Sequence, residues 1–164
     1  MFEERMKRLR NRMVEENISV TLITDEDNVY YYTGFYDYLH MEFGRPTILV
    51  VPHDGDSLLI TPSMEKDMAE VAAVVDRILD WKDGLGNEWR EALPKALGGS
   101  GKVAIETDQI PPVVRHYVES LVEKTRIDNV TPLTADMRMI KSEDELQMAR
   151  HAGQVANTMM AAAH

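Results

Sequence analysis

The stretch from Asn28 to Pro46 concentrates the side chains that could hold a small molecule. It contains five of the six tyrosines, two of the three phenylalanines and two of the nine glycines. Aromatic side chains on an irregular segment are costly unless they cover something, and such segments commonly line ligand sites. The alternative is a core strand followed by an aromatic packing loop, and composition alone leaves both interpretations open.

Arg45 is the residue of this stretch best suited to anchor a charged substrate group. A guanidinium binds a carboxylate through two parallel N–H···O bonds, which a lysine cannot reproduce. Gly44 lets the backbone turn sharply and Pro46 restricts Arg45 to extended conformations, so the loop could aim the guanidinium outward. Phe43 would then be the apolar neighbour that excludes water. The structural alternative is an exposed ion pair with a nearby carboxylate, which contributes little.

Phe35, Tyr36 and His40 complete the set of candidate substrate-binding residues, beside Phe43 and Arg45. His40 lies in the aromatic loop, where the alternative to a substrate contact is a surface or packing role. The histidines show no i, i+4 pair and no His–Glu cluster; they stand at positions 40, 53, 116, 151 and 164. We therefore expect no metal site in this chain. No arrangement indicates a nucleophile, so we expect no catalytic residue either.

Strands that alternate with helices of about ten residues predict an α/β domain with helices covering the sheet faces. The expected strands are residues 18–24, 29–33, 47–51, 57–61, 76–81, 102–106 and 126–130. The expected helices are residues 2–17, about ten residues from Met64, a helix that follows the loop 83–87 and runs to about Leu97, and a helix that starts at Pro111-Pro112.

Local signals define several of these boundaries. Residues 25–28 are expected to form a turn before the aromatic strand 29–33, which Gly34 closes. Residues 53–56 have hairpin-turn chemistry. Ser63 is the expected cap of the helix from Met64.

Composition excludes several classes of partner. At 164 residues the chain is about one domain long, and its net charge of −10 argues against nucleic acid and against an anionic membrane. The absence of cysteine excludes disulfides and thiolate-bound metals. The charged amino terminus lacks the apolar core of a signal peptide, and no apolar run reaches the roughly 18–20 residues of a membrane helix. These features favour a cytoplasmic location.

The last part of the sequence predicts a long helix with a marked start. Ser142 followed by Glu145 is a capping box. The apolar stripe beyond it is unusually wide and comprises Leu146, Ala149, Ala152, Val155, Ala156, Met159, Met160 and Ala163. We expect another element of structure to pack against this apolar stripe. We interpret the sequence as the front part of a longer protein that continues into a further domain.

Two stretches resemble the creatinase/prolidase/Xaa-Pro aminopeptidase family, the pita-bread metallohydrolases. Residues 28–35, Asn-Val-Tyr-Tyr-Tyr-Thr-Gly-Phe, resemble the signature N-x-x-Y-L-T-G-F, with Tyr32 where Leu is usual. Residues 137–146 resemble the junction motif R-x-I-K-[ST]-x-x-E-[IL], where the second domain begins. Residues 43–46, Phe-Gly-Arg-Pro, are similar to the creatinase branch, in which this Phe and Arg reach from one subunit into its neighbour's active site.

The resemblance implies a fold and a domain division. Residues 1–136 would be the amino-terminal domain, an α/β, ribonuclease H-like fold with a mixed sheet of about six strands flanked by helices. Residues 137–164 would be the junction and the first helix of the catalytic domain. That second domain carries the family's metal centre of two Asp, one His and two Glu, which would hold Mn, Zn or Co. The chain by itself would hold no cofactor and would be inactive.

The resemblance also implies a function. We expect an accessory domain of a metal-dependent C–N hydrolase, either Xaa-Pro dipeptidase- or aminopeptidase-like or creatinase-like. It would shape the pocket for a peptide or small-molecule substrate and contribute to a homodimer interface. Its partners would be its own catalytic domain and a neighbouring subunit. The alternative is a non-catalytic protein-binding module, as in the histone-chaperone relative of this family.

Overall fold

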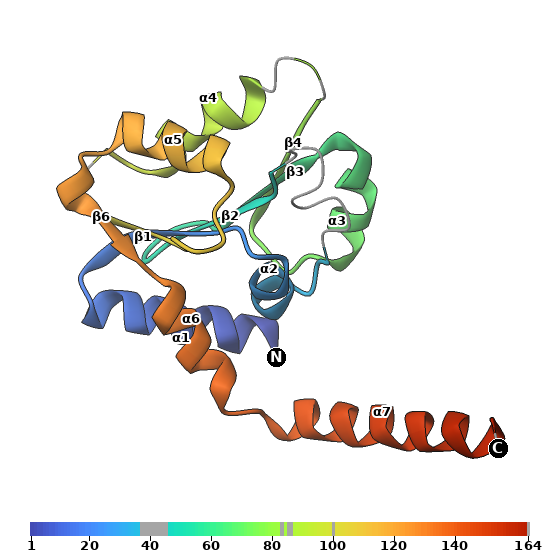
Figure 1. Ribbon diagram of the computed structural model, residues 1–164. Helices are drawn as coiled ribbons and strands as arrows, with labels where there is room; N and C mark the ends of the chain where they lie inside the picture. Colours follow the sequence, from blue (N-terminus) through green and yellow to red (C-terminus); the bar gives the residue numbers. More distant parts are fainter. Residues whose placement is uncertain (37–45, 83, 85–86, 100, 164) are drawn as a thin grey trace. The chain divides into compact units, whose positions relative to one another are not determined.

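The computed structural model describes residues 1–36, 46–82, 84, 87–99 and 101–163. They form two compact units, Met1–Thr131 and Pro132–His164, and each is described by itself. The first unit contains a six-stranded sheet of order β4-β3-β2-β1-β5-β6 (Figure 1). Its strands are β1 (Ile18–Ile23), β2 (Ile48–Pro52), β3 (Leu58–Pro62), β4 (Arg77–Trp81), β5 (Lys102–Ile105) and β6 (Ile127–Asn129).

The sheet is mixed because one strand runs against the others. β2 pairs antiparallel with both β1 and β3, whereas the pairs β1–β5, β3–β4 and β5–β6 are parallel. The prediction of a mixed sheet of about six strands flanked by helices is therefore confirmed.

Helices cover both faces of the sheet (Figure 1). The helical segments of this unit are α1 (Phe2–Glu15), α2 (Glu26–Thr33), the 3-10 turn η2 (Ser63–Glu65), α3 (Lys66–Ala72), α4 (Asn87–Ala96), α5 (Pro112–Leu121) and the 3-10 turn η3 (Lys124–Arg126). α4 and α5 lie on one face, and α1 and α2 lie on the other. α3 packs against β3 and β4. No described helix combines the length and apolar composition needed to cross a bilayer.

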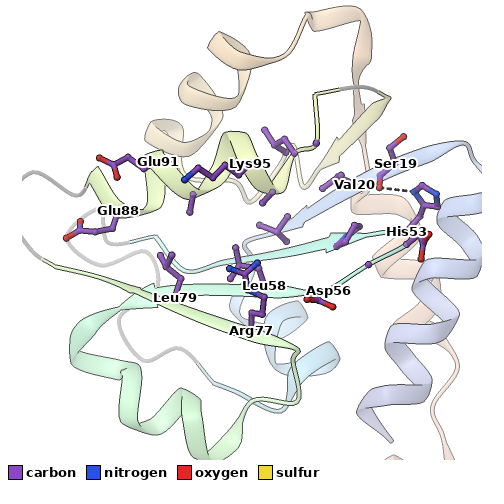
Figure 2. A pocket seen from close by; sticks show the side chains of 18 residues that line it. Ser19, Val20, His53, Asp56, Leu58, Arg77, Leu79, Glu88, Glu91 and Lys95 are labelled. Carbon is purple, nitrogen blue, oxygen red and sulfur yellow. Dashed lines mark hydrogen bonds between the residues drawn. The ribbon is translucent and has the colours of Figure 1, made fainter.

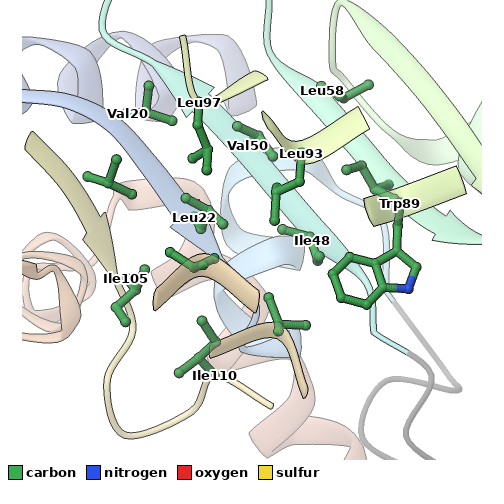
Figure 3. Close-up of a cluster of buried hydrophobic side chains, with 14 of the residues drawn as sticks. Val20, Leu22, Ile48, Val50, Leu58, Trp89, Leu93, Leu97, Ile105 and Ile110 are labelled. Atoms are coloured by element: carbon green, nitrogen blue, oxygen red, sulfur yellow. The ribbon is translucent and has the colours of Figure 1, made fainter. Parts of the chain in front are cut away.

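The central strands alternate their side chains between two apolar layers. On the α4 and α5 side, Val20, Leu22, Ile48 and Val50 pack with Trp89 and other helix residues (Figure 3). The intervening residues of β1 and β2 are equally buried on the other side. Burial on both faces explains why residues 48–51 form an unbroken apolar run.

The predicted strand at residues 29–33 is wrong, because this segment is helix α2. Asp25 caps the helix: its side chain accepts a hydrogen bond from the Asn28 N–H at 3.0 Å. Two further acids in the first turn favour the helix amino terminus electrostatically. Gly34 ends the helix with a φ of +82°, the left-handed conformation that glycine adopts without strain. The expected turn at residues 25–28 is thus the beginning of α2.

Ser63 does not cap a helix as predicted. Its hydroxyl donates to Asp80 Oδ2 at 2.6 Å and lies 3.0 Å from the Trp81 carbonyl oxygen, so it ties η2 to the end of β4. α3 begins only after η2, with no side-chain cap. The predicted helices at residues 2–17, 87–97 and from Pro111-Pro112 are confirmed as α1, α4 and α5.

The second unit contains two helices, α6 (Thr131–Met139), whose first residue ends the first unit, and α7 (Glu143–Ala162). Sequence analysis did not identify α6. The capping box of α7 is confirmed: the Glu145 N–H donates to Ser142 Oγ and the Ser142 N–H donates to Glu145 Oε2. No residue of α7 is buried, and its apolar stripe is open to solvent.

Asp76 joins the starts of β3 and β4 to α1. Its Oδ2 accepts hydrogen bonds from the N–H and the hydroxyl of Ser57, both at 2.7 Å. Arg10 of α1 lies 3.7 Å from the same oxygen and donates to the Gly55 carbonyl at 2.8 Å. The hydrogen bonds from Ser57, more than the Arg10 charge, hold the pKa of Asp76 below its ordinary value of 3.8.

We predict that Asp76→Ala lowers the free energy of unfolding by about 1–2 kcal/mol at pH 7, since two hydrogen bonds to a carboxylate are lost. Because the folded-state pKa is lowered, this contribution is present above the unfolded-state value of 3.8 and disappears as the pH falls through the folded-state pKa. Urea titrations from pH 7 to pH 2.5 measure the difference. Asp56→Ala, at an exposed position in the neighbouring hairpin turn, is the control. A deficit of Asp76→Ala that persists undiminished at the lowest pH would contradict the assignment.

Candidate functional site

The topology brings the aromatic stretch to one edge of the sheet. Five strands run in the same direction, so their carboxyl ends meet at the edge where the antiparallel strand β2 begins. The chain leaves β1, forms α2 and returns to the sheet at β2, with residues 34–47 between them. In α/β sheets, ligands bind outside the carboxyl ends of the strands. The candidate site is therefore the end of the sheet at which these five strands have their carboxyl ends. We call it the carboxyl edge.

Glu106 fixes the geometry of the carboxyl edge. It follows β5, is completely buried, and accepts three hydrogen bonds. The Thr24 and Asp25 N–H groups donate to Oε2 at 2.6 and 2.8 Å, and the Asn28 side chain donates to Oε1 at 2.6 Å. One carboxylate thus joins β5, the end of β1 and the first turn of α2.

Two effects oppose each other at Glu106. Burial raises the pKa of its carboxyl above the ordinary value of 4.5, and the nearby Asp25 charge raises it slightly further. The three N–H donors lower the pKa, because they stabilise the ionised form. Burial dominates, and the pKa of Glu106 is raised on balance.

The far end of α2 is held as firmly as its start. The Thr33 hydroxyl donates to the Val29 carbonyl at 2.7 Å and accepts from the Phe35 N–H at 3.1 Å. Phe35 is 1% exposed, so its ring belongs to the core. Tyr36 is 40% exposed, and its ring meets that of Tyr30 edge-on at 6.3 Å.

The return to β2 has its own anchor. The Trp81 indole N–H, at the end of β4, donates to the Pro46 carbonyl at 3.0 Å. The hydroxyls of Thr47 and Thr61 lie 3.2 Å apart and are both buried. Tyr36 and Pro46 therefore both lie at the carboxyl edge.

Of the five candidate substrate-binding residues, Phe35 and Tyr36 fall in the described part of the chain. Tyr36 offers a half-open aromatic surface, whereas Phe35 is enclosed. His40, Phe43 and Arg45 lie outside the described residues. Their roles stay predictions.

The described residues provide no ligand set for the metal that the family resemblance implies. No three His, Asp or Glu side chains come together within that part of the chain.

A separate hollow of about 760 Å³ lies at the opposite edge of the sheet, between α4 and the hairpin turn at residues 53–56 (Figure 2). Its floor is apolar and includes Val20, Leu58 and Leu79. Charged side chains of both signs stand around it, with Arg77 on β4 and Lys95 on α4. They make no ion pair with one another or with other described residues, so they do not form a convergent binding group. Phe35 and Tyr36, the two predicted site residues in the described part of the chain, do not line this hollow.

Glu106 and Trp81 are the residues of the carboxyl edge that sequence analysis missed. Glu106 directly follows the buried strand β5, which is a usable signal for a polar group at a strand end, and Trp81 is the last residue of β4. The partners of Glu106, however, lie about 80 positions earlier in the chain. Sequence spacing could not pair them.

We predict that Glu106→Leu lowers the free energy of unfolding by about 2–5 kcal/mol, because it leaves two buried backbone N–H groups without an acceptor. Glu106→Gln keeps one acceptor oxygen for these groups and should cost less. Chemical denaturation measures both variants, and Glu123→Gln, at an exposed position, serves as the control. An equal loss for the two Glu106 variants would contradict this account.

The raised pKa adds a pH dependence to this prediction. The folded protein binds the Glu106 proton more tightly than the unfolded chain does. The contribution of Glu106 to stability is therefore full below pH 4.5 and decreases as the pH rises through the folded-state pKa. Glu106→Gln should remove this slope, which is visible as the difference between the two proteins from pH 4 to pH 7.

Known proteins match the chain over most of its length. Creatinase of Bacillus sp. (strain B-0618) is 26% identical over 156 residues, which cover 93% of this chain and 37% of that protein. The crystal structure of a proline dipeptidase from Streptococcus pneumoniae TIGR4 has a TM-score of 0.71 and 28% identity, covering 83% of this chain and 98% of that one. The prolidase from Pyrococcus horikoshii OT3 has a TM-score of 0.77 at 23% identity, covering 98% of this chain and 42% of that one.

The chain spans about two fifths of the length of the curated relatives it matches. The sequence profile described as Creatinase/Prolidase N-terminal domain matches residues 5–140. This match includes most of α1, all of α2 to α6 and all six strands. The resemblance drawn from residues 28–35 and 137–146 is confirmed, and the chain belongs to the creatinase/prolidase N-terminal domain family.

Proposed function

We propose that this chain is the accessory domain of a metal-dependent C–N hydrolase, in which it shapes the substrate pocket and contributes to a homodimer interface. The observation that carries the proposal is the extent of the matches. The match to the creatinase covers 93% of this chain but 37% of the creatinase. The match to the Pyrococcus prolidase covers 98% of this chain but 42% of the prolidase. Most of each relative therefore lies beyond the matched part, and there we place the chemistry.

The substrate is an Xaa-Pro peptide or a creatine-like amidine. The first class is supported by the structural likeness to a proline dipeptidase, and the second by the likeness to a creatinase. A metal ion bound outside this chain would activate the water and polarise the scissile group. The part played by this chain is to bind and orient, through the segment that leaves α2 at Tyr36 and returns to the sheet at Pro46.

A non-catalytic protein-binding module is the second candidate, supported by the net charge of −10, which suits basic partners. The sequence of the longer protein distinguishes the two. Two Asp, one His and two Glu in the family's ligand positions indicate a hydrolase. Their absence, together with no hydrolysis of Ala-Pro or creatine by the manganese-loaded protein, indicates a binding module.

We assign α7 to the catalytic domain of the longer protein that we propose. The match to the proline dipeptidase covers 98% of that protein and leaves out 17% of this chain, whereas the match to the longer prolidase covers 98% of this chain. The exposed apolar stripe of α7 supports the same assignment, because such a stripe is stable when another layer covers it.

We predict that α7 is the least protected helix of the 164-residue protein. Its backbone amides should exchange at least about tenfold faster than those of α5, whose Val114 and Val118 are buried, unless two copies pair through the stripe. Hydrogen exchange read by mass spectrometry, together with a sizing measurement, tests this. A monomer with strong protection at residues 155–162 would contradict it.

For Arg45 we predict that replacement by Lys in the longer enzyme reduces kcat/KM for carboxylate-bearing substrates by about 1.5–3 kcal/mol of transition-state free energy. This is the range for a charge-assisted hydrogen bond. The melting temperature should change little. Arg77→Lys, at the opposite edge of the sheet, is the matched control and should leave the kinetics unchanged. Unaltered kinetics for Arg45→Lys, or a loss explained by unfolding, would remove Arg45 from the site.

A further inference from the structure

The first turn of α1 touches the exit of α2, from which the chain enters the carboxyl edge. We infer that Phe2 and Arg5 are positioning residues: they set the orientation of Gly34, Phe35 and Tyr36, of which Tyr36 is a candidate substrate-binding residue. The inference rests on the proposed function for its effect on catalysis. Its physical basis, a clasp between two helices, is independent of that function.

The carbonyl groups at the end of α2 show how the clasp works. The last carbonyls of a helix lack partners within the helix and must find them elsewhere. The Tyr30 carbonyl accepts from the Gly34 N–H at 2.8 Å, and the Thr33 carbonyl accepts from the Val74 N–H at 2.8 Å. The Tyr31 carbonyl accepts from Arg5 Nη1 at 2.8 Å. α1 therefore supplies one of the groups that complete this helix end.

Arg5 is committed to this role by its surroundings. Its side chain is buried, and its guanidinium lies 4.0 Å from the centre of the Tyr31 ring. It also lies 5.5 Å from the centre of the Phe2 ring. A buried cation with a hydrogen bond to a helix carboxyl end and an aromatic ring on its face is held in one orientation.

The Phe2 ring packs directly against the turn that ends α2. A Cβ built on Gly34 would lie 2.9 Å from Phe2 Cε2, so the ring of Phe2 occupies the space that any other residue at position 34 would need. The left-handed φ of +82° adds a second requirement for glycine. The turn and the Phe2 ring are thus fitted to each other.

The contact continues to the last described residue before the segment. The rings of Phe2 and Tyr30 meet edge-on at 6.3 Å, and those of Tyr30 and Tyr36 meet edge-on at the same distance. Tyr30 and Tyr36 are both exposed at this surface. A displacement of Phe2 would therefore reach Tyr36 through one intervening ring.

Phe2 is separable from the residues that hold α1 on the sheet. Burial of α1 comes from Met6, Leu9 and Met13, which follow at helical spacing, whereas Phe2 is half-exposed. A variant at Phe2 can therefore loosen the clasp without detaching the helix. Leu9→Ala is the matched control, because it weakens the same helix away from the clasp.

The first experiment uses the 164-residue protein and needs no substrate. In Phe2→Leu, the Gly34 and Phe35 amides should exchange with solvent about tenfold faster than in the parent, while the amides of Leu22 and Val50 in the central strands keep their rates. In Leu9→Ala, all four amides should accelerate together. Phe2→Tyr keeps the ring and should restore the parent rates. Parent-like exchange at Gly34 and Phe35 in Phe2→Leu would overturn the clasp.

The second experiment measures kinetics in the longer enzyme with Ala-Pro and with creatine as substrates. Phe2→Leu should raise KM by about tenfold with little change in kcat, as expected for a misplaced binding group. Leu9→Ala should lower the melting temperature and leave KM unchanged, and Phe2→Tyr should behave as the parent.

The outcomes separate the inference from the proposed function. If Arg45→Lys alters the kinetics but Phe2→Leu does not, the positioning role is overturned while the proposed function stands. If neither variant alters the kinetics, the proposed role of the segment fails, and with it the catalytic part of this inference. In that case the amide exchange rates of Gly34 and Phe35 still test whether the clasp exists.

Discussion

One buried carboxylate holds together the elements that make the carboxyl edge. Glu106 accepts two backbone N–H groups at the junction of β1 and α2, and a third donor from Asn28 one turn into the helix. Burying a carboxylate costs free energy, and hydrogen bonds from oriented donors offset that cost. Because the donors lie about 80 residues before the acceptor, the bond can form only when β5 is already beside β1. The position of α2 is therefore tied to completion of the sheet.

The direction of β2 is the second constraint. A parallel return from α2 would require the chain to cross the sheet and enter at the other edge. Since β2 is antiparallel to β1, the chain leaves and re-enters the sheet at the same edge. Tyr36, beside the α1 clasp, and Pro46, which Trp81 anchors, are thus the described residues on either side of this return.

The sequence predicted the sheet well because burial on two faces leaves a direct pattern. The strands within residues 18–24, 47–51 and 102–106 are mostly apolar and buried, and the hairpin turn at 53–56 fixes one register. α2 was mistaken for a strand because three consecutive tyrosines favour strands, while its helix signals lie at its ends. Asp25 and Gly34 are typical cap residues, and they decide the conformation of the eight residues between them. The contacts of Glu106 and Arg5 could not be predicted, since each joins residues far apart in sequence.

The hollow beside α4 and the carboxyl edge differ in how firmly their polar groups are held. At the edge beside α4, charged side chains surround an apolar floor, but they are exposed and unconnected, so each can turn freely toward solvent. At the carboxyl edge, every polar group discussed has a fixed partner: Glu106 has three donors, Trp81 has Pro46, and Arg5 has Tyr31. Binding with defined orientation requires groups whose positions are set before the ligand arrives. The polar groups of the carboxyl edge meet this requirement, because their hydrogen-bond partners fix their positions.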